Sequence, residues 1–156
     1  MKLMDPVPEK TCFMPKPKWI ELALRLAEAA SQASVDRFVK VGAAVLREDG
    51  SVCGIGYNGY PPGFDLDAQE SSDRDFRRDF MVHAETNALA YAVPGEPFLL
   101  AVTYPPCRRC ILEAARYGVK FIVCPQWVPA ESWKFATRLG VTIGLPPSNA
   151  LQIPPR

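Results

Sequence analysis

The sequence has a single histidine and almost no excess charge. Its 156 residues include one histidine, His83, and five cysteines. Eighteen lysines and arginines stand against 17 aspartates and glutamates, so the formal charge is +1. Proteins that hold duplex nucleic acid through many phosphate contacts usually carry a clear basic excess. We therefore expect no duplex nucleic-acid partner, and any histidine chemistry must use His83.

Long apolar runs are also absent. No stretch approaches the roughly 20 apolar residues that cross a bilayer. The start of the chain carries Asp5, Glu9 and several prolines in place of the apolar core of a signal peptide. We expect no membrane partner and a cytoplasmic location. With 48% hydrophobic residues, a chain of this length can bury a core without disulfides.

The two ends of the chain are rich in proline, which removes a backbone donor and disfavours helix in the residue before it. Residues 1–17 are predicted to form an N-terminal arm and residues 146–156 a C-terminal arm. Residues 18–145 are then predicted to form one folded domain.

Within that domain, helices and strands alternate. Apolar residues recur every three or four positions from Trp19 to Ala33, which predicts an amphipathic helix. Two β-prone runs, 41–46 and 52–57, flank Asp49-Gly50, a strong hairpin signal. We predict further helices at 77–93, 107–117 and 130–139, and further strands at 98–104, 121–124 and 141–145. The long loop at 58–75 is expected near a functional site.

The resulting order of elements is α-β-β-α-β-α-β-α-β. Strands separated by single helices are normally parallel neighbours joined by right-handed crossovers. We therefore expect an α/β protein with three α/β/α layers, in which helices cover both faces of a mixed five-stranded sheet.

One group of residues can bind a metal. His83 begins the segment His83-Ala84-Glu85, and Cys107 and Cys110 are three positions apart at a predicted helix start, so that both sulfurs share one face. Zinc prefers nitrogen and sulfur ligands, and a site with three protein ligands keeps a position for a water molecule. Zinc makes such a water acidic, and Glu85 can move its proton.

Each motif has another interpretation when taken alone. A Cys-x-x-Cys pair can be a redox pair or half of a structural zinc site, and a lone histidine is more often packed or solvated than bound to metal. The two motifs in this order, each at a predicted helix start, match the H-x-E and P-C-x-x-C pattern of zinc-dependent base deaminases.

The sequence resembles the cytidine and deoxycytidylate deaminase superfamily over about residues 19–125, and most closely its deoxycytidylate (dCMP) deaminase branch. Residues 34–36 (SVD) followed by 41–43 (VGA) are similar to the family's entry to its first strand. Residues 56–63 (GYNGYPPG) resemble its G-Y-N-G-x-P-x-G loop, and residues 103–107 (TYPPC) resemble its T-x-x-P-C approach to the metal. The segment 83–88 (HAETNA) narrows the resemblance to the branch.

The resemblance implies a cytidine-deaminase-like fold and hydrolytic removal of the 4-amino group of a cytosine nucleotide, most closely dCMP, giving dUMP and ammonia. It implies that His83, Cys107 and Cys110 hold one zinc ion per chain. A zinc-activated hydroxide would attack C4, while Glu85 protonates N3 and then the departing amine.

The resemblance also implies substrate contacts. The Ala84 backbone amide would contact the pyrimidine carbonyl and Asn58 would anchor the sugar, although Asn58 beside Gly59 also suits a turn. Pro105 is expected at the substrate site. Trp127 follows a strand at the sheet end where ligands of α/β folds usually sit, but a buried core tryptophan is an equal interpretation.

A nucleotide substrate needs a cationic or amide-lined phosphate site. We expect Arg37 to contribute to it. Further candidates are Lys40, Arg74, Arg77 and Arg78, for which a solvated helix face is the alternative interpretation.

Two departures from the family pattern limit what the resemblance implies. Many dCMP deaminases use a cysteine or histidine in the loop before His-Ala-Glu for a second, structural zinc, and residues 59–82 contain neither. We therefore predict a single zinc. The chain has Pro61-Pro62-Gly63 where many bacterial relatives have Pro-Arg-Gly, so regulation by dCTP and dTTP is not expected.

Three other functions are considered. One is a deaminase of another small base, nucleoside or nucleotide. Another is a tRNA adenosine deaminase, which typically has Glu before its Pro-Cys and a basic RNA face; Pro105 and the charge of +1 argue against it. The third is a zinc-containing nucleotide sensor without turnover. Relatives form dimers and hexamers, so we expect a homo-oligomer.

Overall fold

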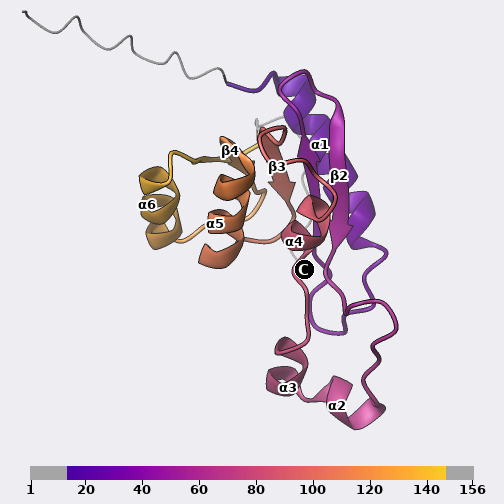
Figure 1. Ribbon diagram of the computed structural model, residues 1–156. Helices are drawn as coiled ribbons and strands as arrows, with labels where there is room; N and C mark the ends of the chain where they lie inside the picture. Colours follow the sequence, from indigo (N-terminus) through magenta and orange to yellow (C-terminus); the bar gives the residue numbers. More distant parts are fainter. Residues whose placement is uncertain (1–13, 147–156) are drawn as a thin grey trace, which may run out of the picture.

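Five strands form one mixed sheet in the computed structural model, which describes residues 14–146 (Figure 1). The strands are β1 (Gly42–Leu46), β2 (Val52–Tyr57), β3 (Leu99–Val102), β4 (Phe121–Val123) and β5 (Thr142–Gly144). They lie in the order β2-β1-β3-β4-β5. β1 is antiparallel to both β2 and β3, whereas β4 is parallel to β3 and to β5. The predicted mixed five-stranded sheet is confirmed.

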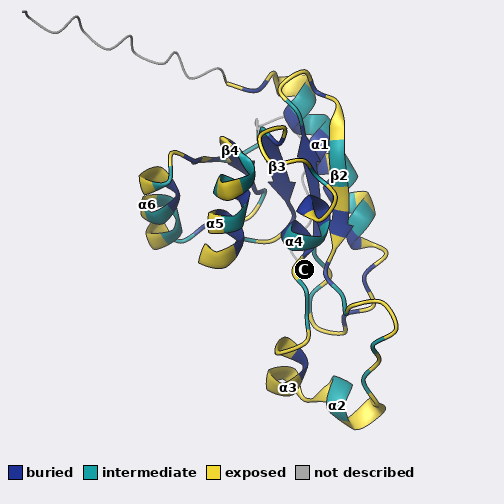
Figure 2. Cartoon of the chain, viewed as in Figure 1, coloured by how far each residue is buried: buried dark blue, intermediate teal, exposed yellow. Residues whose placement is uncertain are grey.

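Helices cover the two faces of this sheet, and the strands β1, β3 and β4 between them are fully buried, as the dark blue of β3 in Figure 2 illustrates. Alternate residues of β1, β3 and β4 point to opposite faces, because side chains alternate along a strand. One face packs on α1 (Pro17–Ser31) through a cluster that includes Leu24, Leu46 and Leu99. The other face packs on α4 (Ala84–Leu89), α5 (Arg108–Tyr117) and α6 (Ala130–Arg138) through a second cluster. This is the predicted three-layer α/β/α arrangement.

The predicted connection between β2 and β3 is wrong in one respect. We expected strands joined through a helix to be neighbours, and β3, β4 and β5 follow that rule. β2 and β3 do not, because β1 lies between them and pairs with both. β1 pairs with β2 in a hairpin along one edge and pairs antiparallel with β3 along the other. β1 therefore lies inside the sheet, where all five of its residues are buried.

The predicted helix at 77–93 and the predicted loop at 58–75 are also corrected. The segment contains three short helices, α2 (Ala68–Ser72), α3 (Arg74–Arg78) and α4. The Asp67 and Asp73 side chains cap α2 and α3 by accepting hydrogen bonds from backbone amides. Helix cannot continue from α3 into α4, because Val82 exchanges both backbone hydrogen bonds with Gly59, at 3.1 and 2.8 Å.

Residues 1–13 and 147–156 lie outside the described part of the chain, and with them most of the two predicted arms. α1 begins at Pro17, two residues before the predicted start, in a position where the missing proline N–H costs no hydrogen bond. Within residues 14–146, no helix combines the length and the apolar character needed to cross a membrane.

Two glycines of β2 allow α4 to lie directly against the sheet. A Cβ atom on Gly54 would lie 2.1 Å from the carbonyl oxygen of Ala88, and one on Gly56 would lie 2.4 Å from its backbone nitrogen. Both contacts are with helix backbone, which cannot move aside as a flexible side chain can. Any side chain at these two positions would therefore push α4 away from β2.

We predict that Gly54→Ala lowers the free energy of unfolding by about 2 kcal/mol or more, because it overpacks this contact. Denaturant unfolding measures the change. Gly144→Ala is the matched control: it lies in β5, no atom of residues 14–146 other than those of its chain neighbours lies within 4 Å of the position of its Cβ, and it should change stability by less than about 0.5 kcal/mol. Equal stabilities of the two variants would contradict the close approach of α4.

Candidate active site

His83 and Glu85 are positioned by the start of α4. His83 is the residue that precedes the first turn, and Glu85 lies inside that turn with only 4% of its surface exposed. α4 is held on one side by its contact with β2. On the other side the Thr86 hydroxyl donates a 2.9 Å hydrogen bond to the Glu113 carboxylate of α5. The start of α4 is thereby fixed relative to α5.

Cys107 and Cys110 lie at the start of α5, facing His83. The Nδ1 atom of His83 is 3.3 Å from the sulfur of Cys110 and 3.6 Å from that of Cys107. The ligand atoms of the three residues all lie within 4.8 Å of one another. Ligands of a tetrahedral zinc ion lie about 3.5 to 3.8 Å apart, given the usual zinc–nitrogen and zinc–sulfur distances. The three side chains therefore fit a single zinc ion.

Electrostatic interactions at the site suit metal binding and proton transfer. Burial raises the pKa of Glu85 to about 7. The pKa of Cys107 is lowered to about 4, chiefly by the hydrogen bond from Cys110 and further by that from His83. The pKa of Cys110 is raised, first by its hydrogen bond to Cys107 and then by burial. Because zinc binds cysteines as thiolates, zinc binding releases a proton from a cysteine that is still protonated.

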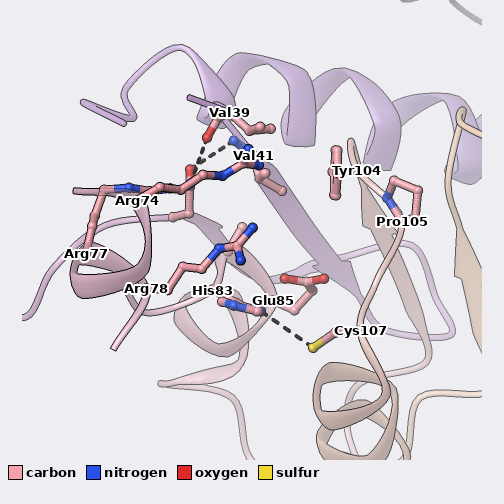
Figure 3. Close-up of a pocket in the computed structure, with 12 residues that line it drawn as sticks. Val39, Val41, Arg74, Arg77, Arg78, His83, Glu85, Tyr104, Pro105 and Cys107 are labelled. Carbon is pink, nitrogen blue, oxygen red and sulfur yellow. Dashed lines mark hydrogen bonds between the residues drawn. The ribbon is translucent and has the colours of Figure 1, made fainter. Parts of the chain in front are cut away.

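A pocket of about 210 Å³ opens beside His83 and Glu85 (Figure 3). Its residues come from the segments that flank β1, β2 and β3, from helices α3 and α4, and from the position directly before α5. Its lining comprises Val39, Val41, Asn58, Arg74, Arg77, Arg78, His83, Ala84, Glu85, Tyr104, Pro105 and Cys107. The predicted residues Asn58, Ala84 and Pro105 thus lie in the same pocket as Glu85 and two of the three metal-binding side chains.

Asn58 forms structural hydrogen bonds within this pocket. Its Oδ1 accepts hydrogen bonds from the Ser34 hydroxyl at 2.7 Å and from the Val41 amide at 2.9 Å, and its Nδ2 donates to the Val39 carbonyl at 2.8 Å. Asn58 therefore joins the end of β2 to the 34–41 loop. Neither the turn interpretation nor the substrate interpretation predicted this structural role. One Nδ2 hydrogen is left for a ligand, and the predicted contact with the sugar stays a prediction.

Arg37 and Trp127 do not line the pocket. Arg37 is exposed, and Trp127 has 76% of its surface exposed, so the alternative interpretation of Trp127 as a buried core residue is wrong. The neighbouring Gln126 holds this loop by donating a 2.8 Å hydrogen bond to the Thr103 carbonyl. The predicted substrate contacts of Arg37 and Trp127 stay untested.

Sequence reasoning missed Tyr104 and Val39 as pocket residues. Tyr104 is adjacent to Pro105 in the approach to the metal, so its place in that motif could have indicated it. Val39 gave no comparable signal, because the hydrogen bond that its carbonyl accepts from Asn58, beside it in the pocket, joins positions 19 residues apart.

The fold and the site define a zinc-binding deaminase. Residues 17–125 match the family described as the cytidine and deoxycytidylate deaminase zinc-binding region, and the chain belongs to that family. The resemblance inferred from the motifs is confirmed, and so is the expectation of a zinc-dependent hydrolase acting on a C–N bond.

Individual relatives agree with this family. The chain is 35% identical over 127 residues to the deoxycytidylate deaminase of Mycobacterium phage D29, covering 72% of this chain and 98% of the relative. It is 29% identical over 127 residues to an uncharacterized deaminase in the luxG 3′ region of Aliivibrio fischeri, covering 81% and 82% of the two chains. The solved structure of the dCMP deaminase from cyanophage S-TIM5, in complex with dCMP and dUMP, matches with a TM-score of 0.67 and 29% identity, over 83% of this chain and 98% of that one.

We predict that His83→Ala abolishes tight zinc binding, because the chain has no other histidine to replace it. Metal analysis of the purified protein should give about one zinc per wild-type chain and close to none for the variant. Cys53→Ser, which changes a cysteine outside the three-residue group, is the control and should keep its zinc. A ratio of two zinc ions per chain would contradict the single site.

Proposed function

We propose that the protein converts dCMP to dUMP and ammonia by hydrolysis. The observation that carries the proposal is that the buried Glu85 lies in the same pocket as His83 and Cys107, two members of the group that also includes Cys110. The likeness to the cyanophage enzyme, whose structure contains dCMP and dUMP, supports cytosine nucleotides as the substrate class.

In this proposal His83, Cys107 and Cys110 hold the zinc ion. The zinc supplies Lewis acidity, so that a water molecule at the site becomes nucleophilic near neutral pH. Hydrolysis forms a bond between the water oxygen and C4 of cytosine and breaks the bond between C4 and the amino nitrogen. The amine leaves as ammonia.

Glu85 is the proposed proton carrier. Its burial keeps the pKa near 7, so the carboxyl group can both accept and donate a proton near neutral pH. It takes a proton from the attacking water and delivers it to N3 of the ring; it then takes the remaining proton of that oxygen, now bonded to C4, and delivers it to the leaving amine. The charged acids on the surface of α2 and α3 do not line the pocket and have no part in this transfer.

The remaining pocket residues bind the nucleotide. Ala84, directly beside Glu85, is the proposed contact for the pyrimidine carbonyl through its backbone amide. Pro105 and Tyr104 line the side of the pocket that lies across from Arg74 and Arg77 (Figure 3). Asn58 can offer its remaining Nδ2 hydrogen to the sugar. In this proposal neither Arg37 nor Trp127 contacts the nucleotide, because neither lines the pocket. Assembly as a homo-oligomer, a dimer or a hexamer, remains a prediction.

We predict that the zinc-loaded protein releases ammonia from dCMP. The test compares dCMP with CMP, dCTP, deoxycytidine, cytosine, guanine and a tRNA bearing the target adenosine. Turnover of guanine or the tRNA without turnover of any cytosine compound would replace the proposal with another deaminase function. Binding of dCMP without any turnover would indicate a nucleotide sensor.

We predict that Glu85→Gln lowers kcat for dCMP by at least about 100-fold while zinc remains bound, since the amide cannot carry the proton. Steady-state ammonia release and metal analysis on the same sample measure the two effects. Glu131→Gln, at an exposed glutamate of α6, is the control and should keep wild-type kcat. Full activity of Glu85→Gln would exclude the proposed proton transfer.

A further inference from the structure

Three arginines of one short helix form a cationic wall of the pocket. The pocket has twelve lining residues, and every lysine or arginine among them belongs to α3: Arg74, Arg77 and Arg78. In Figure 3 they lie on the side opposite Tyr104 and Pro105, and the Arg78 side chain extends toward the middle of the pocket. The three arginines therefore line the same pocket as Glu85.

The distribution of charge in this segment is uneven. Residues 59–82 contain three arginines and six acidic residues, so the segment as a whole is acidic. All three arginines line the pocket, whereas none of the six acids does. Two of the acids, Asp67 and Asp73, instead cap α2 and α3. A helix face that is merely solvated has no reason to separate the charges in this way.

A buried ion pair fixes α3 in place. The Arg77 guanidinium contacts the Asp36 carboxylate, and the two side chains are only 8% and 1% exposed. The other oxygen of Asp36 accepts hydrogen bonds from the backbone amides of Phe38 and Val39, at 2.7 and 2.9 Å. A buried carboxylate without its cation would be costly, so the pair ties α3 firmly to the 36–39 loop.

The Phe38 ring orders the arginines further. It lies 4.6 Å from the Arg77 guanidinium and 5.5 Å from that of Arg74, within the range of cation–π contacts. Arg74 and Arg78 remain exposed. Arg78 has an acidic neighbour in Asp75, which is 3.7 Å away and itself 94% exposed, so the contact is weak. In addition, the buried Nε of Arg77 has no hydrogen-bond partner among the described residues.

We propose that Arg74 and Arg78 bind the phosphate of the nucleotide substrate, and that the ion pair between Asp36 and Arg77 positions them for it. The inference rests on the proposed function and assigns the part of the pocket that selects a nucleotide over a nucleoside or base. Guanidinium groups suit a phosphate because they offer several donors in a planar fork. Asp36 is a positioning residue, since it reaches the substrate only through Arg77 and α3.

The first test replaces Arg74 and Arg78 by glutamine, singly and together. Both are exposed, so the variants should fold. The KM for dCMP should rise roughly 10-fold for each change, with a much smaller change in kcat. The affinity for deoxycytidine, measured as a substrate or as a competitive inhibitor of dCMP, should stay constant because it has no phosphate. Arg138→Gln, at an exposed arginine of α6, is the matched control.

The second test is Asp36→Asn, which removes the charge that holds Arg77. It should raise the KM for dCMP and leave the affinity for deoxycytidine near that of the wild type, a split that general destabilisation of the fold would not produce. Equal losses for dCMP and deoxycytidine would overturn the positioning role.

The outcomes separate this inference from the proposed function. If the wild type deaminates dCMP and deoxycytidine with equal KM, or if the double arginine variant keeps the KM for dCMP, the phosphate site is refuted while the deaminase function stands. If the wild type deaminates no cytosine compound, the proposed function itself fails.

Discussion

The packing of α4 on β2 is the contact on which the site depends. α4 carries His83 and Glu85 at its first turn, and it approaches β2 so closely that backbone touches backbone at two glycines. Glu85 is buried at the start of this helix, and its burial raises its pKa to about 7. It also places His83 opposite the sulfurs of α5. One packing contact therefore positions the helix at whose start the proton-carrying acid and the metal-binding histidine both lie.

The second half of the site is held by the segment that joins β3 to α5. The Thr103 hydroxyl accepts a 3.0 Å hydrogen bond from the Gly42 amide, and the Thr103 carbonyl accepts one from Gln126. These bonds connect the approach to Cys107 with β1 on one side and with the loop after β4 on the other. The metal-binding group is thus built from two helix starts, each anchored to the central strands of the sheet.

The parts of the protein that local patterns determine were predictable from the sequence. The metal-binding residues and Glu85 lie in two short motifs, and Asp49-Gly50 between β-prone runs marked the hairpin. The parts that depend on contacts between distant residues were not. The bridge between Gly59 and Val82 interrupts a segment whose composition favours one long helix. The ion pair between Asp36 and Arg77 joins positions 41 residues apart, so spacing gave no reason to prefer Arg77 over Arg37. The exposure of Trp127 depends on how its loop packs, which residue type does not indicate.

The bridge between Gly59 and Val82 has a consequence for how substrate range can change. It closes the neck of the 59–82 segment, immediately after Asn58 and immediately before His83. In Figure 1 this segment, with α2 and α3, extends from the body of the fold below α4. Because both ends meet at one point, residues can be exchanged, added or removed between them without displacing the metal-binding histidine. Changes within this segment can therefore alter which substrate is bound, in evolution or by design, while the residues that carry out the hydrolysis stay in place.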